Sequence, residues 1–182
     1  MESGRGKMER GEARMARWCC LLLIVLLLGA CGKPPAPPTP VPPTSIPRTP
    51  TPVPATDEEA ILQLLAAEGE GVVQQDIERL MEIWAEDGVV MDARHTPDDT
   101  SDDLTWRGRD AIRQRYVTLV FPGNPSAAGA TDVQLIIEGD TAEALATTRI
   151  GTEVAPGGDR WTFARRGGRW FITSLTYNLE PG

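Results

Sequence analysis

The segment WTFARRGGRWFI, residues 161–172, carries the pattern that decides the predicted fold. Two runs rich in aromatic and β-branched residues flank Gly167-Gly168, which is typical of a β-hairpin. Upstream, Gly139-Asp140 is a second tight turn between two further runs, and Pro156-Gly157-Gly158 predicts a turn between the hairpins. The C-terminal half is therefore predicted to form four antiparallel strands, over residues 133–138, 141–154, 160–165 and 169–179.

N-terminal to these strands, the hydrophobic period changes from two to about 3.6 residues, which predicts helices. Thr56 and Glu59 form a capping box at the start of the first helix. Asp76 begins a second helix, which we expect to end at Gly88. The predicted order is completed by a strand over 89–94, an acidic loop over 95–105, a third helix over 108–120 and a loop over 122–129.

Four segments carry a family resemblance through their order and spacing: DIERL at 76–80, WAEDGVVMD at 84–92, WRGRDAI at 106–112 and the hairpin at 161–172. Together they resemble the nuclear transport factor 2-like superfamily, which includes SnoaL-like polyketide cyclases and steroid isomerases. The resemblance implies an α+β fold with a cone-shaped, curved antiparallel sheet packed on three N-terminal helices. It also implies a pocket in the cone. Because the superfamily includes enzymes, ligand binders and protein-binding modules, the fold does not decide the function.

Asp92 and His95 are the candidate catalytic residues. In isomerase-like members an aspartate on the first strand is a general base, and the resemblance places Asp92 at that point. The rest of the isomerase pattern is absent. The oxyanion-hole tyrosine of that family would fall near Glu68, and its neutral carboxylic acid donor would fall near Arg160, so neither donor is in place. His95, the single histidine, can pair with Asp92 as in cyclase- and dehydratase-like relatives. The alternatives are a strand-end aspartate bonded to loop amides or to an arginine, and a solvated histidine.

Aromatic side chains are candidates to line a pocket for a flat apolar ligand, although a cysteine-free core needs the same residues. They are Trp84, Trp106, Tyr116, Trp161, Phe163 and Tyr177. The acidic loop lacks EF-hand spacing, and the sequence holds no Walker loop, GxSxG, HExxH, paired CxxC or dinucleotide fingerprint. No cofactor and no metal site is therefore predicted.

The N-terminus has the pattern of a lipoprotein signal peptide over residues 1–30. A basic leader precedes the apolar run Leu21–Leu28, which is too short to span a bilayer core of about 20 residues. The segment LGAC, residues 28–31, resembles the lipobox, which implies cleavage before Cys31 and lipid attachment to its thiol. A plain secretory signal or an uncleaved anchor is the alternative. We expect a lipid-anchored protein at the cell membrane or outer envelope, facing outside the cytoplasm.

Residues 31–56 are predicted to be a linker, because residues 33–56 contain 11 of the 16 prolines and such composition favours extended polyproline II. Residues 57–182 then form one domain. Cleavage before Cys31 would leave 13 basic and 23 acidic residues, a net charge of −10. This acidity argues against a nucleic-acid partner, which requires a basic surface.

Three functions remain open at this point. The first is an envelope-facing domain that binds a small apolar ligand or a protein partner. The second is an isomerase-, cyclase- or dehydratase-like enzyme with Asp92 as general base. The third is a structural module that forms homodimers. The non-enzymatic interpretation is favoured because the isomerase donors are missing.

Overall fold

The computed structural model describes residues 53–182, so the predicted signal peptide, Cys31 and most of the proline-rich linker lie outside the described residues. The helices are α1 (Asp57–Gln74), α2 (Ile77–Ile83) and α3 (Arg109–Arg115), with shorter helical turns η1 (Thr100–Asp102), η2 (Tyr116–Val120, π-helical) and η3 (Phe121–Gly123). The strands are β1 (Trp84–Asp92), β2 (Leu104–Arg107), β3 (Ala128–Glu138), β4 (Thr141–Ile150), β5 (Glu153–Arg166) and β6 (Arg169–Tyr177).

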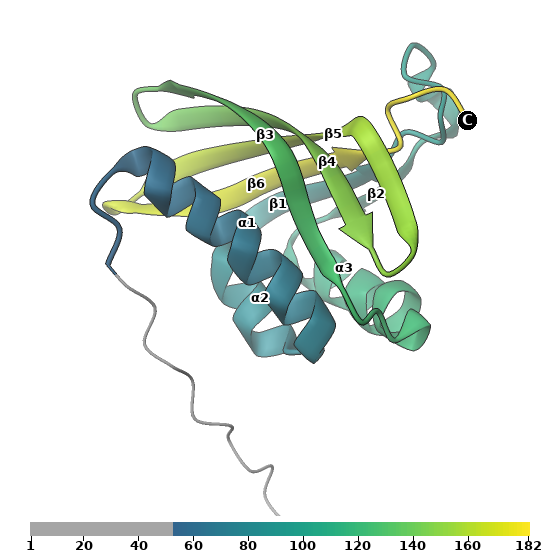
Figure 1. Cartoon of the computed structure of the whole chain (residues 1–182), viewed down its shortest axis with the longest axis horizontal. Coiled ribbons are helices and arrows are strands. Elements are labelled where there is room, and N and C mark those ends of the chain that lie inside the picture. Colours follow the sequence, from purple (N-terminus) through teal and green to yellow (C-terminus); the bar gives the residue numbers. More distant parts are fainter. Residues whose placement is uncertain (1–52) are drawn as a thin grey trace, which may run out of the picture. The chain divides into compact units, whose positions relative to one another are not determined.

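The six strands form one sheet in the order β2-β1-β6-β5-β4-β3. Strands β3 to β6 pair antiparallel, as does β1 with β2, but β1 runs parallel to β6, so the sheet is mixed. Figure 1 shows the long strands arching over the helices. The predicted α+β fold, a curved sheet packed on three helices, is confirmed.

Helix α1 begins as the capping box predicts and is tied to the sheet at the same point. Thr56 Oγ1 accepts from Glu59 N at 3.1 Å, while a Glu59 carboxylate oxygen accepts from the backbone of Ala55 at 2.7 Å. Asp57 accepts two hydrogen bonds of 2.8 Å from Arg165 in β5 and one of 2.9 Å from Trp170 in β6. The Trp170 bond and the Arg165 charge lower the pKa of Asp57, so this junction favours the carboxylate.

Gly69 lets α1 lie directly on β3. A Cβ atom at this position would stand 2.6 Å from the carbonyl oxygen of Ala128, closer than atoms can pack. Glycine is therefore required for the helix to approach the strand backbone. The contact places the middle of α1 against the inner face of the sheet, whose small residues Ala142, Ala144 and Ala146 leave room for it.

The strand predicted over 141–154 is divided by a turn at Gly151-Thr152 into β4 and the start of β5. Two further boundary predictions are wrong because strand pairing overrides the local signal. Helix α2 ends at Ile83 rather than at Gly88, because β1 starts at Trp84 and pairs there with Ile172 of β6. The predicted turn at 156–158 lies inside β5, where the register with β4 shifts between Ala146 and Thr148, as at a β-bulge. Strand β2 was not predicted; it lies at the end of the predicted acidic loop.

The core lies between the helices and the inner face of the sheet. Its largest fully buried members include Ile61 and Leu80 from the helices and Ile172 from the sheet. Within residues 53–182, no helix combines the length and the apolarity needed to cross a membrane.

Candidate functional site

Four polar side chains are buried inside the cone and come from separate elements. Glu68 lies on α1, Arg115 ends α3, Tyr116 begins η2 and Asp159 lies on β5. Their exposed fractions are 7%, 7%, 1% and 1%. Burial of charged groups costs free energy unless they are paired, so the bonding of each one indicates its role.

Glu68, Tyr116 and Trp84 form a closed hydrogen-bond network, which we call the inner network. The Tyr116 hydroxyl donates to Glu68 Oε1 at 2.8 Å, and Trp84 Nε1 donates to the Tyr116 oxygen at 3.2 Å. Burial raises the pKa of Glu68 and raises that of Tyr116 well above its ordinary value of 10. The phenol therefore keeps its proton and holds the carboxyl of Glu68 in place.

Arg115 lies within a cage of three aromatic rings. Its Cζ atom is 4.9 Å from the ring centre of Tyr177, 5.2 Å from that of Trp106 and 5.8 Å from that of Tyr116. Such contacts attract the guanidinium to the ring faces. Its Nε atom is buried without a hydrogen-bond partner among the described residues. Arg115 thus carries a buried N–H group without an acceptor beside aromatic rings.

Asp159 is a second buried carboxyl, with an exposed fraction of 1%. Neither of its carboxylate oxygens has a hydrogen-bond partner within residues 53–182. Burial raises its pKa from 3.8 to about 6, and the charge of Glu180 adds to the rise. The hydroxyl of Thr148 and the backbone N–H groups of Thr148 and Asn178 oppose the rise without meeting hydrogen-bond geometry. Asp159 can therefore gain or lose a proton near neutral pH.

The structure does not bring Asp92 and His95 together as a hydrogen-bonded pair. Asp92 Oδ1 accepts from the side-chain amide of Asn178 at 2.7 Å and from the backbone N–H of Arg94 at 3.0 Å. His95 Nδ1 donates to the carbonyl of Glu180 at 2.7 Å, and its side chain is exposed. Asp92 thus has the bonding of a strand-end aspartate held by amides. Its catalytic role and that of His95 stay predictions.

The six predicted pocket aromatics divide into two groups. Trp84, Tyr116, Trp161 and Phe163 are at most 1% exposed and belong to the hydrophobic core. Trp106 and Tyr177 are partly exposed and face Arg115. Burial raises the pKa of Tyr177, while the charge of Arg115 opposes that rise. The ligand-lining role of the six aromatics stays a prediction.

Arg115 and Asp159 were not predicted as site residues, although each had a signal in the sequence. Asp159 alternates with Trp161 and Phe163 at the period of a strand, so the three share the inner face. Arg115 follows the buried Ile112 by three residues on a helix, which places it on the same side. In both cases the signal is a charged residue on an otherwise apolar face, which indicates a buried charge.

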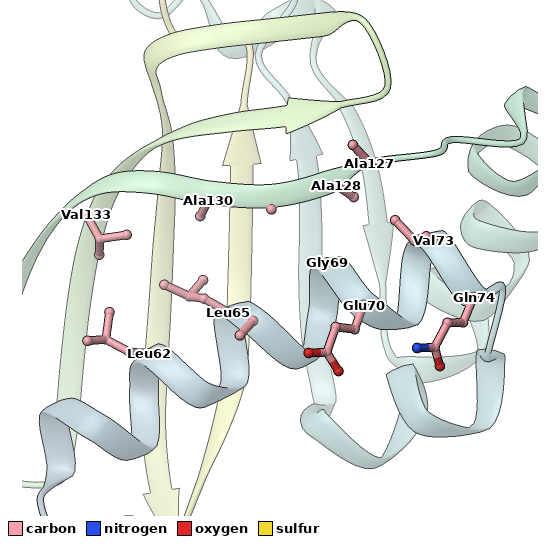
Figure 2. Close-up of a pocket in the computed structure, with 12 residues that line it drawn as sticks. Leu62, Leu65, Gly69, Glu70, Val73, Gln74, Ala127, Ala128, Ala130 and Val133 are labelled. Atoms are coloured by element: carbon pink, nitrogen blue, oxygen red, sulfur yellow. The ribbon is translucent and has the colours of Figure 1, made fainter. Parts of the chain in front are cut away.

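A separate groove of about 430 Å³ lies between α1 and β3. Figure 2 shows Leu62 and Leu65 of α1 opposite Ala130 and Val133 of β3. Glu70 and other polar groups lie toward its rim, and none of the six predicted aromatics lines it. It is an apolar surface groove, distinct from the buried polar residues of the cone.

Comparison with known proteins identifies the fold. The profile of the family described as SnoaL-like domain matches residues 57–173. An NTF2-like protein with a cystatin-like fold from Novosphingobium aromaticivorans is 25% identical, with a TM-score of 0.53 over 66% of this chain and 79% of its own. A protein of unknown function with a cystatin-like fold from Nostoc punctiforme is 14% identical, with a TM-score of 0.52 over 69% of this chain and 92% of its own. No curated protein matches the chain.

Proposed function

The chain belongs to the SnoaL-like domain family, and from this premise we propose that it binds a small organic molecule inside the cone. The observation that carries the proposal is the buried Nε–H of Arg115, which has no partner among the described residues and lies between Trp106 and Tyr177. A buried donor without an acceptor costs free energy, and a bound molecule can supply that acceptor.

The arrangement favours a flat molecule with an oxygen acceptor. Aromatic walls offer broad apolar contact, and Arg115 offers a charged donor that fixes orientation. Asp159 contributes a second polar group that can accept or donate according to its protonation. These features are those of a small-molecule site with apolar walls and few polar groups.

Mass spectrometry of the intact full chain, purified in mild detergent, tests this proposal. A retained small molecule is expected on the wild-type chain and on the control Arg113→Met. Arg113 lies on α3 like Arg115, but it pairs with Glu78 of α2 at the surface. The small molecule is expected to be lost from Arg115→Met. Equal retention by Arg115→Met, or no retained molecule after exposure to a metabolite extract, would overturn the proposal.

Catalysis is the second candidate, and it is favoured by the pKa of about 6 at Asp159. A general acid or base works best when its pKa lies near the operating pH. Asp159, rather than Asp92, is then the residue placed to move a proton on the bound molecule. Deuterium uptake into carbon positions of the retained molecule in D₂O would support this role, provided that Asp159→Asn abolishes it without abolishing retention.

We also propose that lipid on Cys31 anchors the domain outside the cytoplasm. The lipobox-like LGAC at 28–31 and the apolar run before it support the anchor. The net charge of −10 after cleavage gives no electrostatic attraction to anionic lipid, so the lipid must hold the protein alone. Cys31→Ala should move the protein from the membrane fraction to the soluble fraction.

Homodimerisation through the sheet stays a further proposal. Ile136 of β3 and Leu145 of β4 are 65% and 39% exposed, and strand alternation places both on the outer face. Light scattering of Ile136→Glu beside the wild-type chain tests it, with a change from dimer to monomer as the expected result.

A further inference from the structure

The C-terminal tail, residues 178–182, is held between the loop after β1 and the strand β5. The backbone N–H of His95 donates to Asn178 O at 3.0 Å, and His95 Nδ1 donates to Glu180 O at 2.7 Å. On the other side, Leu179 N donates to Gly158 O at 2.8 Å. These bonds set the tail directly beside Asp159.

The side chain of Glu180 packs onto Gly158, the residue before Asp159. A Cβ atom at position 158 would overlap Glu180 Oε2, so only glycine leaves space for this carboxyl. Glu180 Oε2 is buried and, like both oxygens of Asp159, has no hydrogen-bond partner within the described chain. Three carboxyl oxygens without a hydrogen bond thus belong to residues that meet at Gly158, and we call this region the carboxyl corner.

The charged groups around the carboxyl corner do not neutralise it. Among residues 53–182, no ion pair involves Asp159 or Glu180. From α1, Glu68 faces Asp159, whose negative charge adds to the raised pKa of Glu68. Thr148 of β4 contributes an uncharged hydroxyl, itself without a partner, and His95 faces the backbone of the tail. Two ionised carboxylates in this corner would repel each other.

We propose that Asp159 and Glu180 form a proton-operated latch that closes the C-terminal tail over the site. With one proton between them, the protonated carboxyl donates to the other carboxylate and the tail stays closed. With both ionised, repulsion in a buried corner releases the tail and frees Asp159 to meet a ligand. The latch itself stands on the tail contacts, whereas its effect on ligand binding rests on the proposed function.

The direction of the response follows from the acid–base chemistry of the pair. Burial raises the pKa of Asp159 to about 6, so the closed form holds its proton below that pH. Opening lowers that pKa toward its ordinary value of 3.8, so opening is coupled to the loss of one proton between about pH 4 and pH 6. In that window the opening equilibrium increases by up to about tenfold per pH unit, and above about pH 6 it no longer depends on pH.

Hydrogen exchange of the ligand-free full chain in detergent, followed by mass spectrometry of tail peptides, tests the latch between pH 4 and pH 8. After correction for intrinsic exchange rates, protection of the Leu179 amide should fall by up to about tenfold per unit as the pH rises from about 4 to 6 and be constant above it. In Glu180→Gln, whose amide can donate to Asp159 at any pH, protection should be independent of pH. The matched control Glu153→Gln, an exposed change on the same strand as Asp159, should behave as wild type.

Two results would overturn the latch. One is wild-type protection that does not change with pH, or that changes equally in Glu180→Gln. The other is protection that rises with calcium and falls with a chelator at constant pH, which would assign the carboxyl corner to a cation. Because no ligand is needed, a protein that retains no small molecule would refute the proposed function and leave this result intact.

Discussion

The inner network and the carboxyl corner are two buried polar regions of one interior, and they differ in how their groups are bonded. In the inner network, Tyr116 supplies a donor to Glu68 and an acceptor to Trp84. In the carboxyl corner, Asp159 and Glu180 present oxygens that find no donor within residues 53–182. A closed network of polar groups fixes a core, whereas unpaired groups store unfavourable free energy that a proton or a ligand can relieve. The comparison favours a structural role for the inner network and makes the carboxyl corner the region on which the proposals depend.

The largest expected effect comes from opening the inner network. Tyr116→Phe leaves the carboxyl of Glu68 and the indole N–H of Trp84 buried without their partner. The free energy of unfolding should fall by about 2–4 kcal/mol. Urea denaturation measures it, with Tyr177→Phe as a control at a partly exposed phenol. A loss as small as that of the control would show that the inner network does not stabilise the fold.

The carboxyl corner should respond in the opposite direction. The pKa of Asp159 is raised on folding, so its stabilising contribution is complete below pH 3.8 and is lost as the pH rises to about 6. The rise corresponds to roughly 3 kcal/mol. Asp159→Asn should therefore be more stable than wild type at pH 7.5 by about 1–3 kcal/mol, with a smaller difference at pH 4.

Denaturation at a series of pH values measures this difference. Asp98→Asn, in the exposed loop after β1, is the matched control and should leave the wild-type pH dependence unchanged. A destabilised Asp159→Asn at pH 7.5 would mean that the carboxylate of Asp159 is bonded after all.

The charge of Arg115 acts on Glu68 of the inner network, and removing this charge should change protonation more than stability. Arg115→Met should cost about 1 kcal/mol or less, because an apolar side chain often replaces a buried charge without loss. The charge of Arg115 opposes the raised pKa of Glu68, so that pKa should rise further in the variant. Carbon-13 NMR titration of the Glu68 carboxyl measures it, and an unchanged midpoint would contradict the placement of Arg115.

The smallest effect is expected at the mouth of the cone. Asp92→Asn keeps an oxygen that can accept from Asn178 and Arg94, so folding should be retained with a loss below about 1 kcal/mol. The negative charge of Asp92 contributes to the raised pKa of Tyr177, which should fall in the variant. Ultraviolet titration of tyrosine measures it. An unfolded variant would make Asp92 a structural residue.

The strands with strong local turns were predictable from the sequence, and the strands defined by distant partners were not. Gly139-Asp140 and Gly167-Gly168 form the two turns as expected, since all three of their glycines adopt the positive φ that these turns need. Strand β1 starts early because its partner, β6, follows about 90 residues later in the chain. Local helical spacing carries no information about that pairing.

The candidate site was less predictable than the fold. The resemblance directs attention to Asp92 and His95, which lie at the strand end and on the surface. In the sequence, Arg115 and Asp159 are charged residues on otherwise apolar faces. This pattern predicts that they are buried, but it does not predict which residues contact them. The role of Glu180 depends on the packing of residues 178–182 against β5. The sequence does not predict this packing, which is seen only in the folded structure.

Titration of the Asp159 carboxyl by carbon-13 NMR of the full chain tests most directly the claim that the cone holds a buried carboxyl without a protein donor. Asp159→Asn assigns the signal by its disappearance. We predict a midpoint at about pH 6, and a lower one in Glu180→Gln, because the charge of Glu180 contributes to the rise. A midpoint at or below the ordinary 3.8 would show that the carboxylate has found donors in the protein, and would contradict both the site and the latch.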